Sequence, residues 1–207
     1  MDEKEFFELS RKLSNLYLEV KSIMLFAEDE DLDQKLILTS VNEIRNAFDH
    51  VMRSFADGES LKANFESATG HLYRAGFDAY EVISISIIKQ IQDFRRSYSF
   101  ESIVAAYPDY YQKIIPRIEE IKRIKVSARG NKTINDKIKP EDHFKEFGKI
   151  VADLDKLKKE MDLHIFSIQE ADKSFKKKQF RNRIIALFST IIGGILVYFI
   201  TRKLFGW

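Results

Sequence analysis

"EIRNAFDHVMRSF", residues 43–55, carries the spacing that decides the fold of this chain. Its apolar residues recur at alternating steps of three and four, at Ile44, Phe48, Val51 and Phe55. An α-helix turns once in about 3.6 residues, so these side chains form one stripe that must be buried against a partner. The flanking segments repeat the pattern, at Phe6, Leu9, Leu13, Leu16, Val20 and Ile23, and at Leu61, Phe65, Ala68, Leu72, Ala75, Ala79 and Val82. We therefore expect three amphipathic helices that pack on one another.

Turn-forming residues are scarce, which favours few and long helices. The 207 residues include only 8 Gly and 3 Pro. Asp57-Gly58 separates the second helix from the third, and Ser60 is placed to cap the third, so these two helices should form an antiparallel hairpin. The third helix is expected to run on through residue 99. The alternation at residues 82–88 also fits a strand, although no second strand candidate exists to pair with it.

The second half of the chain predicts two further helical regions. Pro108 and Pro116 punctuate the first, and the polar segment 127–142 is typical of a loop before a long helix capped by Glu141 or Asp142. We expect an all-α fold, an up-and-down bundle of long helices with one C-terminal transmembrane helix. The predicted parts are a helical bundle at 1–130, a long helix leading to the membrane at 141–181 and a transmembrane helix at 184–201.

The segment "IIALFSTIIGGILVYFIT" (184–201) contains no charged residue. As a helix it is about 27 Å long, close to the roughly 30 Å of a bilayer's hydrocarbon core. Six basic residues precede it and two follow, at Lys173, Lys176, Lys177, Lys178, Arg181 and Arg183, then Arg202 and Lys203. This asymmetry predicts a single-pass protein of the inner (cytoplasmic) membrane, with its N-terminal domain in the cytoplasm and its Lys-rich run on membrane lipids. The alternative is a buried core helix that ends a soluble domain.

Composition narrows the chemistry. The chain has no cysteine, which rules out disulfides, thiol nucleophiles and zinc–thiolate sites. Its four His are not at metal-ligand spacing and it has no Gly-rich phosphate loop, so we expect no metal and no cofactor. The net charge of +2 is too small for a nucleic-acid signal from the whole protein. The basic segment 117–139, with Tyr107, Tyr110 and Tyr111 nearby, could bind phosphates and bases, but a solvated face is the simpler interpretation.

The helix at 43–55 also has a polar face. Arg45 lies at the flank of the apolar stripe, and the residues that point away from the stripe are Asn42, Asn46, Asp49, His50 and Arg53. A matching stripe on the third helix contains Asn64, Ser67, His71, Arg74, Asp78 and Glu81. We predict that these faces form a polar groove or interface, with the members Asp49, Arg53, His71, Arg74 and Asp78. The alternative is a charge ladder along one helix, at Arg45, Asp49 and Arg53.

The motif "RNAFDH", residues 45–50, resembles that of the HEPN superfamily, all-helical domains found in RNases of toxin–antitoxin, CRISPR and abortive-infection systems. The family motif is an Arg and a polar residue, then a short spacer and a His, although it usually lies late in the domain rather than in the second helix. The resemblance implies a metal-independent RNase with catalytic residues Arg45, Asn46 and His50 at a dimer interface. In that chemistry His acts on the 2′-hydroxyl or the leaving oxygen, and Arg holds phosphate charge.

The plan of the chain is similar to that of a membrane HEPN-like accessory protein of RNA-targeting (type VI) CRISPR systems, which assembles in the membrane and is thought to permeabilise it. This resemblance implies a homo-oligomer, with RNA or an RNA-guided nuclease as a further partner. Small residues in the span, at Ala186, Ser189, Thr190, Gly193 and Gly194, are the predicted oligomer face in the membrane. The alternative is that membrane helices simply tolerate Gly.

Two functions follow from these patterns. The first is a membrane-anchored HEPN-like effector of prokaryotic antiviral defence that oligomerises and perturbs or permeabilises the membrane. The second is a membrane-tethered, metal-independent HEPN ribonuclease. The first is favoured, because cutting soluble RNA requires no anchor and the motif lies in an unusual place.

Overall fold

The computed structural model of the protein describes residues 2–31, 37–56, 60–134 and 139–206. Within these residues the chain forms α-helices and one short π-helix, and no strand. In chain order they are α1 (Glu3–Glu30), α2 (Leu38–Arg53), α3 (Leu61–Ser97), α4 (Phe100–Ala106), the π-helix η1 (Tyr110–Ile114), α5 (Ile115–Ile134), α6 (Pro140–Asp162) and α7 (Ile165–Phe205). The expected all-α bundle of long helices is confirmed.

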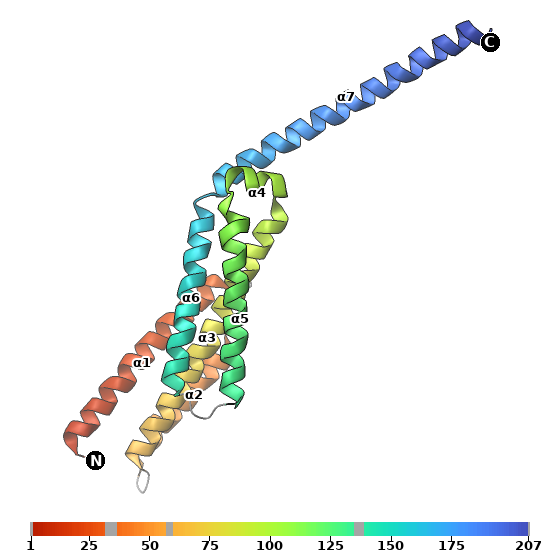
Figure 1. Cartoon of the computed structure of the whole chain (residues 1–207). Helices are drawn as coiled ribbons and strands as arrows, with labels where there is room; N and C mark the ends of the chain where they lie inside the picture. The colour runs from red at the N-terminus through yellow and green to blue at the C-terminus, as the bar shows by residue number, and fades with distance from the viewer. Residues whose placement is uncertain (1, 32–36, 57–59, 135–138, 207) are drawn as a thin grey trace.

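Helix α3 is the centre of the bundle, because α1, α2 and α6 all pack against it (Figure 1). Helix α5 packs on α6, and α4 packs on the first turns of α7. The fully buried aliphatic side chains include Val20 on α1, Leu154 on α6, and Ile83, Ile87 and Ile91 on α3. The core therefore follows α3 along much of its length.

Residues 82–88 are helical, so the strand alternative is wrong. They lie inside α3, which runs unbroken for 37 residues. Ile83, Ile87 and Ile91 are spaced one helical turn apart and are all fully buried, so the helical period rather than the alternation matches the core. At the start of α3 the Ser60 side chain accepts a hydrogen bond from the Ala63 N–H, as the expected N-cap. Asp57-Gly58 lies outside the described residues.

The expected loop at 127–142 is shorter than its composition suggests. Helix α5 continues to Ile134, and α6 begins at Pro140. The one glycine of this stretch of α5, Gly130, costs a helix only about 1 kcal/mol, so it does not end one. Pro140 is favourable in the first turn of α6, because N–H groups in that turn have no carbonyl partner within the helix and Pro has no N–H to leave unpaired. Glu141 and Asp142 lie in this first turn rather than at the cap.

The long helix expected from residue 141 is two helices, because the chain bends at Leu163 and His164 between α6 and α7. The His164 ring stacks on Tyr107 with centroids 3.9 Å apart and planes 13° from parallel. After the bend, Ile168 of α7 is fully buried. The regular helix is interrupted at this bend, and the His164–Tyr107 stack and the burial of Ile168 hold the start of α7 against the bundle.

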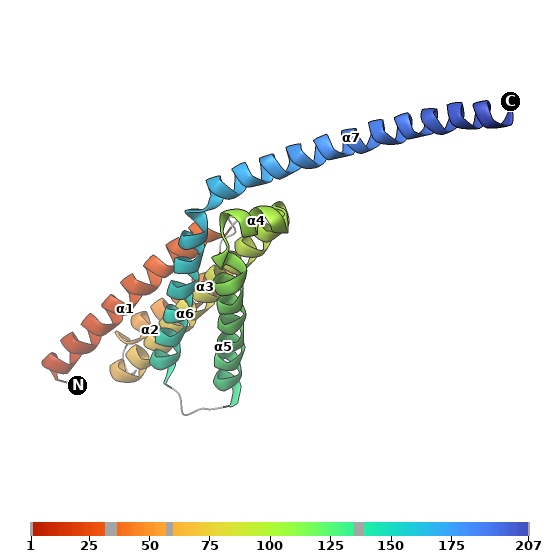
Figure 2. The same ribbon diagram turned by 45° about the horizontal axis from the view of Figure 1, so that its top comes forward.

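Helix α7 leaves the bundle and extends far beyond it, as both views show (Figures 1 and 2). It is 41 residues long, and its apolar half is not buried within the bundle. Among the described residues it is the one helix long and apolar enough to cross a membrane. The alternative of a buried core helix is wrong, because this segment packs against no other part of the described chain.

Candidate functional site

A ladder of polar side chains joins α2 to α3. The Nδ1 of His50 lies 2.9 Å from the Asn64 side-chain oxygen, and the Nδ1 of His71 lies 2.7 Å from a Glu43 carboxylate oxygen. The His50 and His71 rings stack between these contacts, with centroids 5.2 Å apart. Arg74 completes the group, because its Nε donates to the same Glu43 oxygen at 2.9 Å. We call these five residues the histidine ladder.

The charges of the histidine ladder are partly shielded from solvent. The side chains of Glu43 and His71 are 24% and 18% exposed. Desolvation acts to raise the pKa of the Glu43 carboxyl, but hydrogen bonds and charge from His71 and Arg74 outweigh it and hold the pKa below its ordinary value. Glu43 is therefore an anion at neutral pH and anchors the two basic side chains.

The proton on His71 controls how the ladder is bonded. The Nδ1 of His71 lies 2.7 Å from Glu43 Oε2 and also 2.7 Å from Arg74 Nη2. With a proton this nitrogen donates to the carboxylate, and without one it accepts from the guanidinium. Two imidazoles beside a fixed carboxylate and guanidinium are the side chains that general acid–base chemistry uses near neutral pH.

The three residues of the "RNAFDH" motif do not come together within one chain. Arg45 and His50 are five positions apart in the helix, so they project about 140° apart around α2. His50 faces α3, whereas Arg45 is exposed at the edge of an apolar groove on another side of α2. Asn46 is half-buried on the same helix. The guanidinium beside the histidines is that of Arg74, not Arg45.

The predicted polar interface forms in part. Of the residues predicted for it, His71 and Arg74 on α3 contact Glu43 on α2. Asp49 and Arg53 instead form an i, i+4 ion pair of 2.9 Å on α2, with both side chains more than half exposed. This contact matches half of the alternative charge ladder. Asp78 is half-buried on α3, four residues beyond Arg74.

Glu43 and Asn64 are the members of the ladder that the sequence interpretation underrated. Glu43 and His50 are seven residues apart on α2, and Asn64 and His71 are seven apart on α3. Seven residues are almost two helical turns, so each pair shares one face. In an antiparallel hairpin these equal spacings place Glu43 opposite His71 and His50 opposite Asn64. The two equal spacings in the sequence could therefore have predicted these contacts between α2 and α3.

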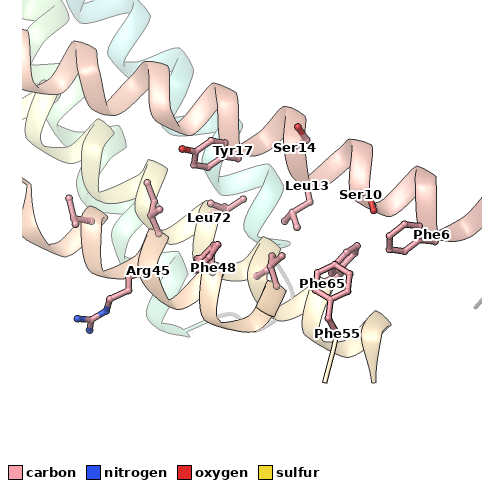
Figure 3. Close-up of a pocket in the computed structure, with 15 residues that line it drawn as sticks. Phe6, Ser10, Leu13, Ser14, Tyr17, Arg45, Phe48, Phe55, Phe65 and Leu72 are labelled. Carbon is pink, nitrogen blue, oxygen red and sulfur yellow. The ribbon is translucent and has the colours of Figure 1, made fainter. Parts of the chain in front are cut away.

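An apolar groove lies between α1 and the α2–α3 hairpin, with a volume of about 750 Å³ (Figure 3). The apolar stripe of α2 lines it but is incompletely covered, because Phe48 and Phe55 remain 62% and 64% exposed. Exposed aromatic side chains that share one concave surface are typical of a binding site rather than of a solvated helix. The expectation that this stripe is buried throughout is therefore wrong.

The start of α7 is fixed to the bundle through one buried carboxylate. Asp172 is 5% exposed and accepts hydrogen bonds from the Ser99 N–H at 3.3 Å and the Ser102 hydroxyl at 3.1 Å. Lys176 on α7 pairs with it at 2.6 Å. The hydrogen bond from Lys176, with those from Ser99 and Ser102, outweighs desolvation and holds the pKa of Asp172 below its ordinary value. Asp172 thus joins α7 to the N-terminus of α4, whose N-cap is Ser99.

The predicted oligomer face in the span is one continuous surface of α7. Its five members, Ala186, Ser189, Thr190, Gly193 and Gly194, fall within an arc of about 140° around the helix. A side chain added at Gly193 or Gly194 would meet no atom within 4 Å. The Thr190 hydroxyl on this face donates to the Ala186 carbonyl within the helix, so its hydrogen bond is made inside α7.

Two of the three tyrosines near the basic segment are not available to stack on bases, whereas Tyr111 is half-buried. Tyr107 and Tyr110 are 4% and 0% exposed, so the idea of a stacking platform is wrong for both. Arg117 in the basic segment already pairs with Glu120 and Asp153, each at 2.7 Å. This surface is better described as a charged, solvated face.

Among the described residues, no group of three or more His, Asp or Glu side chains is arranged to hold a metal ion.

The comparisons with known proteins assign this chain to no family. No protein-family model, curated protein or solved structure matches this chain.

Proposed function

We propose that this chain is a membrane-anchored, HEPN-like effector of prokaryotic antiviral defence that oligomerises and perturbs or permeabilises the membrane. The observation that carries the proposal is the continuity of α7, which runs from its buried contacts at Ile168 and Asp172 into the apolar segment as one helix. A flexible tether would merely localise a domain. A continuous helix that is packed at its base transmits a movement of the domain to the span.

Charge supports the orientation in this proposal. The Lys-rich run on α7 lies between the bundle and the apolar segment, and its side chains are exposed. On the cytoplasmic side of the inner membrane these cations meet anionic lipid head groups, each contributing about 1 kcal/mol. The bundle then lies in the cytoplasm, beside the head groups that the run contacts.

Self-association is needed because one helix cannot enclose a pore. The small-residue face of α7 allows close approach of helices in lipid, where packing rather than the hydrophobic effect drives association. Because every copy is anchored with the same orientation, a closed assembly has its rotation axis along the membrane normal.

The test is dye release from vesicles of phosphatidylcholine and phosphatidylglycerol that carry the full-length protein. We expect release that depends on protein density and is lost when Gly193 and Gly194 are both changed to Leu. The matched control changes Phe188 and Ile195 to Leu, because these residues lie on the opposite face of α7. Inserted protein that releases no dye at any density contradicts the proposal.

The second candidate is a membrane-tethered, metal-independent HEPN ribonuclease, and the histidine ladder is the observation that favours it. Two stacked imidazoles beside an arginine are suitable for acid–base cleavage of RNA. Within one chain, Arg74 is the guanidinium placed to hold phosphate beside His50 and His71. Arg45 could contribute only from a second subunit. Loss of RNA cleavage in His50→Ala, with cleavage retained after deletion of residues 182–207, would support this candidate over the first.

A further inference from the structure

The apolar groove between α1 and the α2–α3 hairpin is chemically polarised. Among its described lining residues, Arg45 is the one charged side chain, and the other polar groups are the hydroxyls of Ser10, Ser14 and Tyr17. Every other lining residue is apolar. A trough of this composition favours a ligand that is almost entirely hydrocarbon and carries one negative charge.

The charge lies at one end of the groove. Arg45 and Tyr17 are at the same end, whereas Phe6, Phe55 and Phe65 gather at the other (Figure 3). The Phe6 and Phe65 rings contact each other there, with centroids 6.0 Å apart. The Arg45 side chain extends from α2 away from α1, so its guanidinium lies exposed at the outer rim, where it can bind an anion without taking either charge out of water (Figure 3).

The dimensions match one acyl chain. From Phe6 to Tyr17 the groove follows α1 for about 16 Å, at roughly 1.5 Å per residue. The hydrocarbon depth of one lipid leaflet, half of a bilayer's roughly 30 Å, is about 15 Å. The groove volume of about 750 Å³ lies within the range of small-molecule sites, roughly 300–1,000 Å³.

We propose that this groove binds a long-chain fatty acid, with its carboxylate on Arg45 and its chain toward Phe6, Phe55 and Phe65. A guanidinium keeps its charge at all physiological pH values and can hold both carboxylate oxygens at once. The source is free fatty acid rather than bilayer lipid, because the groove lies toward the end of the bundle remote from α7 (Figure 1). This binding activity is additional to the proposed membrane function and does not depend on it.

The experiment uses full-length protein in phosphatidylcholine nanodiscs and a photoactivatable palmitate analogue, with crosslinked peptides identified by mass spectrometry. We expect crosslinks on α1 and α2 residues of the groove, and competition by palmitate but not by methyl palmitate. Arg45→Gln should raise the palmitate concentration needed for half-competition about three- to fivefold, as expected for an ion pair that stays in water. Arg45→Lys should restore most of the affinity, and Ser14→Trp, which fills the groove from an exposed position, should abolish labelling.

The matched control is Arg53→Gln, because Arg53 is on the same helix and is paired with Asp49 outside the groove. It should label like the unchanged protein. Labelling confined to α7 overturns the proposal, as does equal competition by the acid and its methyl ester. Crosslinks between two copies through Phe48 and Phe55 that palmitate does not displace also overturn it, since a second subunit then covers the groove.

Discussion

His50 on α2 and His71 on α3 are far apart in the sequence, yet their rings stack with centroids 5.2 Å apart. Each has its own acceptor on the facing helix, Asn64 for His50 and Glu43 for His71. The stack therefore ties α2 to α3 through two parallel polar contacts. It also concentrates the titratable side chains of the hairpin at one place.

Removing the Glu43 charge should weaken the hairpin in a pH-dependent way. The folded-state pKa of Glu43 is held below its ordinary value, so its stabilisation is present above the unfolded pKa and is lost as pH falls through the folded pKa. Glu43→Gln should cost roughly 1 kcal/mol at neutral pH and less in acid. Chemical denaturation at several pH values measures this, with Glu8→Gln, an exposed partner of Lys12, as the control. A cost that does not change with pH would contradict the assignment.

Asp172 should be required to couple α7 to the bundle. Asp172→Ala leaves the Ser99 N–H without its acceptor and the Ser102 hydroxyl with only the Ser99 hydroxyl, at a cost of about 1–3 kcal/mol. Hydrogen exchange of α4 amides should rise, and dye release should fall if α7 transmits motion. Lys176→Ala is the control for the exchange measurement, because it removes the exposed partner and leaves the Asp172 contacts with Ser99 and Ser102 in place. Unchanged exchange in α4 after Asp172→Ala would refute this coupling.

Two glycines on α3 should respond in opposite directions to a methyl group. At Gly76 an added Cβ would overlap the Phe144 ring and lie 3.1 Å from Val20 Cγ2, both in the core, so Gly76→Ala should destabilise by about 1–3 kcal/mol. At Gly70 the nearest atom is Arg74 Nη1 at 3.6 Å, so Gly70→Ala should stabilise by about 0.5–1 kcal/mol. Thermal unfolding of both variants gives the comparison. A stable Gly76→Ala protein would show that α6 packs less closely on α3.

His143 should be replaceable by an apolar residue with a gain in stability. It is 5% exposed beside Phe77, and neither ring nitrogen has a hydrogen-bond partner among the described residues. The nearest charge, the Glu146 carboxylate, is 3.9 Å from its Nδ1, too far for a hydrogen bond. A buried polar group without a hydrogen bond costs about 1–3 kcal/mol, so His143→Leu should raise the free energy of unfolding by about 1 kcal/mol. His164→Leu is the comparison, since it removes the Tyr107 stack and should destabilise. A loss of stability in His143→Leu would mean that the ring has a polar role in the fold.

The orientation in the membrane can be measured directly. In sealed inverted vesicles the cytoplasmic face is outside, so added protease should digest the bundle. Substituting Gln for Lys176, Lys177, Lys178 and Arg181 should weaken this preference. Full protection of the bundle in inverted vesicles would reverse the proposed topology.

Local periodicity was enough to predict the helices, the α2–α3 hairpin and the apolar half of α7. These features depend on which residues share one face of one helix, and that is set by spacing alone. The end of α5 was predicted less well, because polar composition at 127–134 resembles a loop although no residue there forbids a helix. The bend at Leu163 and His164 was missed because its cause, the ring stack on Tyr107, comes from a distant part of the chain.

The sequence alone determined that this protein is a helical bundle joined to an apolar helix of membrane-spanning length. Only the tertiary structure decided which polar residues meet. Arg45 and His50 are close in the sequence but lie on different sides of α2, whereas His50 and His71 meet across the hairpin. The physical reason is that helical geometry separates neighbours in sequence by their angle around the axis, while packing between helices joins residues whose separation no local pattern encodes.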